Sequence, residues 1–254
     1  MATIVTMGRG GTGKTSFVAL TAKYLMEIGQ TPLLLIDLDP DQSLGETVGV
    51  NMEELGKSSI ADLVSTTFIE GGGTLVGVPP SERIGNKLWE KGMYEGEKFD
   101  LVTIGTKWVE GCYCLPNAAV KKALEDLTKT YRHILLDSPA GLEHLNRRIT
   151  SRVDDIFDIV DPSKKSFEHV KRAYKLVGEV GIEFNNFYVV GGYRFPQELG
   201  INITKETNLK FLGKVEYDKT VEGYVLAGTS LLDIPQTSVA YESIKTIMSG
   251  AGYH

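Results

Sequence analysis

The amino-acid sequence predicts an α/β protein with a doubly wound, mostly parallel sheet and helices on both faces. Short apolar runs alternate along the chain with longer amphipathic stretches, and no segment repeats at a fixed period. Residues 33–36 are apolar at every position, which is typical of a parallel strand covered on both faces. These two patterns predict the fold class.

The individual elements follow from the same patterns. Apolar residues at positions 17, 18, 20, 24, 25 and 28 have helical spacing, and Gly29 ends that helix. The expected helices cover residues 16–27, 118–130, 166–180 and 221–227. The expected strands cover residues 2–7, 32–37, 99–104, 133–136, 156–160, 187–190 and 211–215.

The whole chain, residues 1–254, is expected to form a single domain with one irregular excursion. Residues 68–97 are the least regular part, because three consecutive glycines at 71–73 are followed by two prolines at 79 and 80. By surface scaling, a chain of this size buries about 73% of its unfolded surface, which is enough for a large core without disulfides. We therefore expect the excursion to lie on the surface of the domain.

Composition and charge exclude several classes of protein. The chain has 27 basic and 33 acidic side chains and a net charge of −6, which argues against a nucleic-acid binder held by bulk charge. No stretch approaches the roughly 18 uncharged apolar residues of a membrane span, and the first residues do not resemble a signal peptide. We expect a reduced, cytoplasmic protein that binds neither membrane nor nucleic acid.

The strongest chemical signal is a glycine-rich segment between the first expected strand and the first expected helix, Gly8-Arg9-Gly10-Gly11-Thr12-Gly13-Lys14-Thr15. It fits the pattern G-x-x-x-x-G-K-[ST], in which successive backbone N–H groups and the helix N-terminus enclose a phosphate. Lys14 would supply a charge to the β- and γ-phosphates, and the Thr15 hydroxyl would ligate Mg²⁺. Ser16 completes the expected nucleotide-binding segment. The alternative is an ordinary glycine-rich turn.

Two acidic segments follow expected strands, where ligands collect in open α/β sheets. Asp37 and Asp39 share a face if the chain is extended, so one could lie over the Mg²⁺ shell and the other beside the attacking water. The alternative is that either one caps the next helix. Asp137 follows another strand and is placed like a carboxylate of the Mg²⁺ site, while the Gly141 N–H could reach a γ-phosphate.

These residues resemble the deviant Walker A ATPases of the MinD, ParA and nitrogenase iron-protein class, a group of P-loop NTPases. The resemblance implies that the basic residue after the first motif glycine reaches the partner's phosphates in a nucleotide-bound homodimer. That residue is Arg9 here, where lysine is usual, and arginine keeps the charge but changes the geometry. The resemblance also implies that Asp39 orients the water. The family's adenine-reading asparagine is missing from residues 188–194.

Two further stretches resemble CooC-type nickel-inserting ATPases, which mature carbon monoxide dehydrogenase, and the related maturation factor for acetyl-CoA synthase. Residues 111–117 are similar to their C-x-C-P-x-N segment, and residues 140–147 to their A-G-I-E-H-L-G-R segment. Leu115 replaces the commoner proline and Asn146 replaces glycine. Neither departure touches the two thiols.

The two cysteines, Cys112 and Cys114, are the only ones in the chain. In an extended segment both sulfur atoms point the same way, but a four-thiolate site needs a second pair. A twofold homodimer would supply that pair, giving one shared site for Ni²⁺ or Zn²⁺. The alternative is a pair of ordinary reduced cysteines in a loop, because C-x-C alone is a weak motif.

The predicted function is that of a slow ATPase that cycles between ATP and ADP with Mg²⁺, closes as a homodimer and delivers a divalent metal to a client nickel enzyme. The alternative is a MinD- or ParA-like switch that positions a partner on membrane or DNA without a metal. Such a switch should carry a basic C-terminal helix, and residues 237–254 contain one lysine and one glutamate. An iron–sulfur reductase would need cysteines far apart in the sequence.

Overall fold

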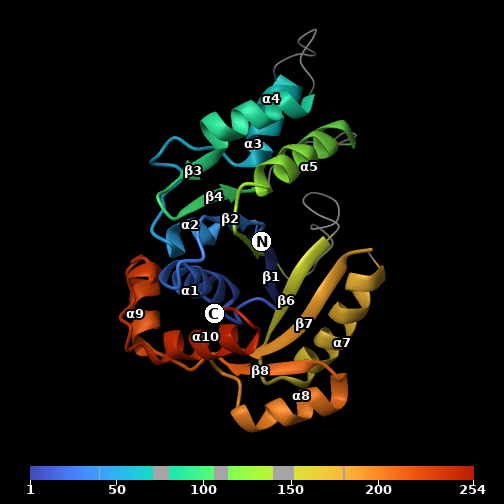
Figure 1. Ribbon diagram of the computed structural model, residues 1–254, viewed down its shortest axis with the longest axis vertical. Helices are drawn as coiled ribbons and strands as arrows, with labels where there is room; N and C mark the ends of the chain where they lie inside the picture. The colour runs from blue at the N-terminus through green and yellow to red at the C-terminus, as the bar shows by residue number, and fades with distance from the viewer. Residues whose placement is uncertain (40, 71–79, 106–113, 140–151, 180) are drawn as a thin grey trace.

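The computed structural model describes residues 1–39, 41–70, 80–105, 114–139, 152–179 and 181–254. Within these residues eight strands form one sheet, in the order β3-β4-β2-β5-β1-β6-β7-β8 (Figure 1). The strands are β1 (Ala2–Gly8), β2 (Leu33–Asp37), β3 (Met93–Glu95), β4 (Phe99–Thr103), β5 (His133–Asp137), β6 (Arg152–Val160), β7 (Glu183–Gly191) and β8 (Lys210–Lys214). All neighbours are parallel except β3 and β4. The predicted fold class is confirmed.

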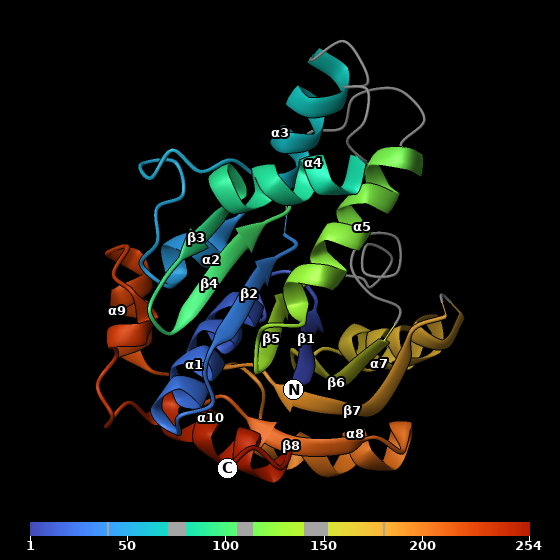
Figure 2. The ribbon, with the colours of Figure 1, turned by 45° about the horizontal axis from the view of Figure 1, so that its top comes forward.

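Helices cover both faces of the sheet and bury a separate apolar cluster on each. Phe17, Leu44 and Ile244 belong to the cluster on one face, and Ile84, Leu124 and Val170 to the cluster on the other. Figure 2 shows α4 and α5 together on one side of the sheet. The helices are α1 (Lys14–Glu27), α2 (Ser43–Thr47), α3 (Ile60–Val64), α4 (Pro80–Lys87), α5 (Cys114–Thr128), α7 (Lys164–Glu179), α8 (Gly200–Thr207), α9 (Lys219–Leu226) and α10 (Val239–Gly250).

The register of the central strands aligns the expected site residues at one edge of the sheet. Asp37 at the end of β2 lies opposite Asp137 at the end of β5. Asp137 in turn lies opposite Thr6 in β1, and Gly8 lies opposite Ile159 in β6. Every residue of β2 and of β5 is buried, as the apolar run at 33–36 predicts. The candidate site residues therefore gather where the parallel strands end.

The excursion expected at residues 68–97 is more regular than predicted. Residues Pro80–Lys87 form α4, and Met93–Glu95 form an antiparallel edge strand beside β4. Proline fits the first turn of a helix, and Ile84 and Leu88 on one side of this segment are buried in the core. The prediction of an irregular segment, which rested on its glycine and proline content, was therefore wrong for these residues. Residues 71–79 lie outside the described ranges.

The C-terminal segment forms a helix that belongs to the core. The Ser238 hydroxyl accepts a hydrogen bond from the Tyr241 backbone N–H and so caps α10. Ile244, Ile247 and Met248 on its inner face are buried in the cluster that also contains α1. In the part of the chain that the structure describes, no helix has the length and apolar character needed to cross a membrane.

Replacing Ile244 by alanine tests the contribution of α10 to the core. The side chain is 0% exposed, so the truncation should lower the free energy of unfolding by about 2–5 kcal/mol. Leu226, which is 82% exposed, is the control, and Leu226→Ala should change the same quantity by no more than about 0.5 kcal/mol. Urea unfolding measures both, and equal effects would contradict the packing of α10.

Candidate functional site

The glycine-rich segment connects β1 to α1 as a tight loop with three left-handed or otherwise positive backbone angles. The φ angles are 141° at Gly8, 75° at Gly11 and 92° at Gly13. Gly13 occupies the N-cap position of α1, and no side chain there accepts from the first N–H groups of the helix. The first turn also contains no acidic residue. A fourteen-residue helix thus presents an uncapped N-terminus beside the loop, which favours an anion.

Gly8 and Gly10 differ in how closely other atoms approach them. A Cβ atom on Gly8 would lie 2.3 Å from the Ile159 carbonyl oxygen, so β1 and β6 meet there with no room for a side chain. A Cβ atom on Gly10 or Gly11 would have no atom within 4 Å. The loop is therefore fixed at its first residue and open around Gly10 and Gly11.

Lys14 is the first residue of α1, and its side chain folds back over the loop. Its exposed fraction is 8%, and its Nζ donates a long hydrogen bond, 3.4 Å, to the Arg9 carbonyl oxygen. The Thr12 hydroxyl donates to the same oxygen over 2.9 Å. The charge of the ammonium also opposes the rise in pKa that burial causes in two carboxyl groups, Asp137 and Asp158. A buried cation beneath the loop is suited to bind phosphate oxygens.

Thr15 and Asp137 form the part of the site that fits Mg²⁺. The Thr15 hydroxyl donates to Asp137 Oδ2 over 2.6 Å and lies 3.5 Å from the Ser43 hydroxyl. Asp137 Oδ1 is buried and has no hydrogen-bond partner in the described chain. Burial raises the pKa of Asp137 to about 6, against the opposing effect of the Thr15 hydrogen bond. Hydroxyl and carboxylate oxygens are the donors that Mg²⁺ prefers, so these residues fit the ion.

Asp37 and Asp39 organise the turn between β2 and α2. Asp37 accepts hydrogen bonds from the backbone N–H groups of Asp39 and Leu44, both over 2.9 Å. It therefore holds the first turn of α2, as in the capping alternative. Burial, and then the charge of Asp137, raise the pKa of Asp37 to about 7. Asp39 is partly buried and accepts from the Asp41 N–H over 3.1 Å.

Arg9 turns toward its own chain in this structure. Its Nη1 lies 2.9 Å from Asp161 Oδ2 and donates to the Ser163 hydroxyl over 3.1 Å. Its side chain is 40% exposed. A role of Arg9 on a partner's phosphates stays a prediction, and it requires this ion pair to open.

A cavity of about 250 Å³ continues from the loop along α1. Its lining includes Gly13, Ser16 and the rings of Tyr193 and Tyr217, whose centroids are 6.3 Å apart. Tyr193 thus occupies the segment from which the adenine-reading asparagine is missing. The size and aromatic lining suit a planar heterocycle.

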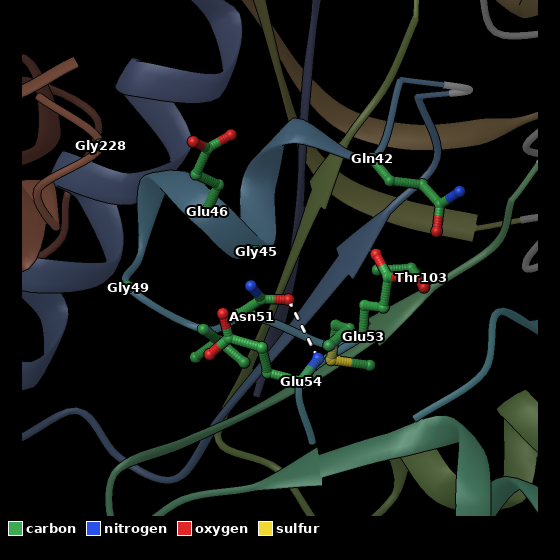
Figure 3. Close-up of a pocket in the computed structure, with 11 residues that line it drawn as sticks. Gln42, Gly45, Glu46, Gly49, Asn51, Glu53, Glu54, Thr103 and Gly228 are labelled. Carbon is green, nitrogen blue, oxygen red and sulfur yellow. Dashed lines mark hydrogen bonds between the residues drawn. The ribbon is translucent and has the colours of Figure 1, made fainter. Parts of the chain in front are cut away.

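A larger cavity, about 640 Å³, lies beside α2 and the end of β4 (Figure 3). Glu46, Glu53 and Glu54 line it, and the Glu54 N–H donates to Asn51 Oδ1. Three carboxylates would repel a polyphosphate. The loop at Gly8–Lys14 is therefore the better phosphate site.

Part of the expected metal site lies outside the described residues. Cys112 and Gly141 are among the residues not described. Cys114 is the first residue of α5, so the cysteine pair does not lie wholly in an extended segment as expected. The helix expected at residues 118–130 therefore begins four residues earlier than predicted. Among the residues that are described, no group of three or more histidine, cysteine, aspartate or glutamate side chains could hold a metal ion.

Sequence reasoning missed several residues that the structure brings to the loop. Asp161 and Ser163 contact Arg9, and Tyr217 faces Tyr193. Asp158 is fully buried in β6, where burial raises the pKa of its carboxyl group to about 7. Of these residues, only Asp158 could have been found from the sequence, because it is a charged residue inside an apolar run that predicts a buried strand.

Comparison of the sequence with known families gives a match to the AAA domain family AAA_31 over residues 2–188. An uncharacterized ATP-binding protein of Methanocaldococcus jannaschii is 34% identical over 249 residues, which is 96% of each chain. The carbon monoxide dehydrogenase accessory protein CooC of Rhodospirillum rubrum is 27% identical over 240 residues, 91% of this chain and 89% of that protein. The chain belongs to the AAA_31 family.

Solved structures share the fold at low sequence identity. The MinD cell division protein of Aquifex aeolicus superposes with a TM-score of 0.69 at 21% identity, covering 99% of this chain and 97% of that one. A ParA family ATPase of Chlorobium tepidum superposes with a TM-score of 0.71 at 16% identity, covering 100% and 98%. The architecture is that of the MinD and ParA proteins.

Gly8→Ala should damage the loop and the sheet together. The added Cβ would clash with the Ile159 carbonyl, and alanine disfavours a φ of 141°. The free energy of unfolding should therefore fall by about 1–3 kcal/mol or more. Gly10→Ala is the control, since its Cβ would have nothing within 4 Å. Thermal unfolding compares the two variants, and equal midpoints would contradict the close contact at Gly8.

Proposed function

We propose that this protein is an ATP-hydrolysing switch that closes as a homodimer and uses its cycle to hold and deliver a divalent metal ion. The observation that carries the nucleotide part is the uncapped N-terminus of α1 at a glycine loop, next to the Thr15–Asp137 pair. The metal part rests on the cysteine pair and on the similarity to the CooC protein at 27% identity.

The phosphates of ATP would lie in the loop formed by Gly10, Gly11, Thr12 and Gly13. Backbone N–H groups there, together with the helix N-terminus, would donate to phosphate oxygens. Lys14 would move its ammonium from the Arg9 carbonyl to the β- and γ-phosphates, because a charged acceptor binds it more strongly than a carbonyl at 3.4 Å. The cavity beside Ser16 and Tyr193 would hold the base.

Thr15 and Asp137 would hold Mg²⁺, and Asp37 would support this site through α2. Mg²⁺, when bound, supplies positive charge that offsets the charge of the phosphates. Asp37 contributes by fixing α2 through Leu44, which keeps Ser43 beside Thr15. Asp39, two residues after Asp37, would orient the attacking water from its partly buried position.

Dimer formation would follow from the state of Arg9. The guanidinium is partly exposed and pairs with Asp161 in the single chain. A solvent-screened ion pair of this kind contributes no more than about 1 kcal/mol. Two charge-assisted bonds to a partner's phosphates would exceed that, so nucleotide would favour the closed homodimer.

The metal would bind where two chains meet. Cys112 and Cys114 give two thiolates per chain, and a twofold axis through this segment would give four, which suits Ni²⁺ or Zn²⁺. The client would be a nickel enzyme such as carbon monoxide dehydrogenase or acetyl-CoA synthase. The competing proposal, favoured by the fold likeness to MinD and ParA, is a switch that positions a partner protein and binds no metal.

Lys14→Ala should abolish ATP-dependent dimerisation. Without the ammonium, the phosphates lose their charged donor and the closed state loses its nucleotide. Sedimentation with ATP and Mg²⁺ should show a shift from monomer to dimer in the wild-type protein and none in the variant. Lys122→Ala, at a lysine that is 55% exposed on α5, should behave like wild type. A normal shift in Lys14→Ala would refute the assignment.

Metal titration separates the two proposals. A shared four-thiolate site should saturate at about half an ion per subunit, shift monomer to dimer and release protons as the thiols ionise. Cys112→Ser and Cys114→Ser should each lose tight binding and keep ATP binding, because the phosphate loop is a separate site. One ion per subunit without a change in mass would exclude the shared site. Unchanged metal affinity in the double serine variant would place the metal elsewhere.

A further inference from the structure

Asp158 lies on β6 inside the apolar layer between the sheet and α7. Its exposed fraction is 0%, and neither carboxylate oxygen has a hydrogen-bond partner in the part of the chain that the structure describes. The residues two positions before and after it, Ile156 and Val160, belong to the apolar cluster on that face. An unpartnered buried carboxylate destabilises a fold, so its presence calls for a functional reason.

The position of Asp158 connects it to the phosphate loop. The register places it beside Met7, one residue before the loop begins at Gly8. Burial is the larger cause of its raised pKa, and the charge of Lys14 opposes it. No hydrogen bond joins the two groups, because both Asp158 oxygens are without a partner in the described chain and the Lys14 Nζ donates to the Arg9 carbonyl.

The charged groups around Lys14 come from several elements. Lys14 acts on Asp137 at the end of β5, on Asp158 in β6 and on His169 in α7, whose pKa is lowered by burial and then by Arg9 and Arg172. Asp137 already accepts the Thr15 hydroxyl. Asp158 is therefore the carboxylate in this group with both oxygens unpartnered in the described chain, and the charge of Lys14 acts on it.

We propose that Asp158 is a buried counter-charge for Lys14: the negative charge of Asp158 balances the ammonium in the empty loop and is neutralised by a proton when phosphate binds. The inference rests on the proposed binding of phosphates by Lys14. In the binding step one proton passes from solvent to a carboxylate oxygen of Asp158, the ammonium keeps its three protons, and no covalent bond of the nucleotide changes.

The direction of the effect follows from charge repulsion. Bound phosphates raise the free energy of an ionised carboxylate beneath them, so the pKa of Asp158 is higher with nucleotide than without it. At low pH the group is neutral in both states and has no effect on affinity. At high pH it is ionised in the empty site, and binding must either overcome the repulsion or take up a proton.

Calorimetry with ADP and Mg²⁺ at pH 6 and pH 8.5 tests this in the intact chain. Asp158→Asn keeps the shape and removes the charge. The variant should bind ADP as tightly as wild type at pH 6 and about tenfold more tightly at pH 8.5. In buffers of different ionisation enthalpy near neutral pH, wild type should take up more protons on binding than the variant does.

Asp155→Asn is the matched control on the same strand. Asp155 is also buried, but its carboxylate accepts hydrogen bonds from Asn186 and Tyr253, away from the loop. This variant should show the wild-type pH dependence. Equal pH dependence and proton uptake in wild type and Asp158→Asn would overturn the inference while leaving nucleotide binding intact. Failure of wild type to bind ADP would overturn the proposed function and the inference together.

A second measurement uses the nucleotide-free protein. Lys14→Met should lower the unfolding midpoint at pH 8.5, because it leaves the Asp158 charge without its counter-charge. The same change in the Asp158→Asn background should have a smaller effect, and Asp158→Asn alone should raise the midpoint. Identical effects of Lys14→Met in both backgrounds would show that the two groups do not act on each other and would overturn the inference.

Discussion

The contact between Gly8 and the Ile159 carbonyl is the constraint on which the candidate site depends. Because β1 and β6 approach each other at Gly8 without room for a side chain, β1 ends at Gly8 and the loop begins there. The loop then delivers Gly13 to the N-cap position of α1, so the uncapped helix end and the ends of the neighbouring strands face the same volume. The position of the anion site is thus fixed by backbone contacts.

The buried charged groups around the loop lower the stability of the protein without a ligand. Asp37, Asp137 and Asp158 end or nearly end three strands, and burial raises the pKa of each. Lys14 is a buried cation among them. Such groups are costly to bury, and under the proposed function both signs of charge find partners when a polyanion and a divalent cation enter together. The cost of burying these groups is thus offset when the proposed ligands bind.

The sequence predicted the features that depend on local pattern. Fully apolar runs identified β2, and the glycine spacing with Lys14 and Thr15 identified the loop. Pairs between distant parts of the chain could not be predicted, because nothing local links Arg9 to Asp161, which is 152 positions away. The helix α4 was missed since its stability comes from Ile84 packing in the tertiary core, and residues near Gly71 and Pro79 suggested irregular chain.

Few elements of the chain separate the cysteine pair from the proposed phosphate site. Cys114 begins α5, and α5 leads into β5, whose last residue, Asp137, accepts the Thr15 hydroxyl. Under the proposed function, a displacement of α5 on metal binding would be transmitted through one helix and one central strand to the proposed Mg²⁺ ligands, Thr15 and Asp137. Linkage requires the reverse effect to be equal, so nucleotide that reorders Asp137 must alter metal affinity by the same factor. Under the proposed function, metal release and nucleotide binding are therefore coupled equilibria.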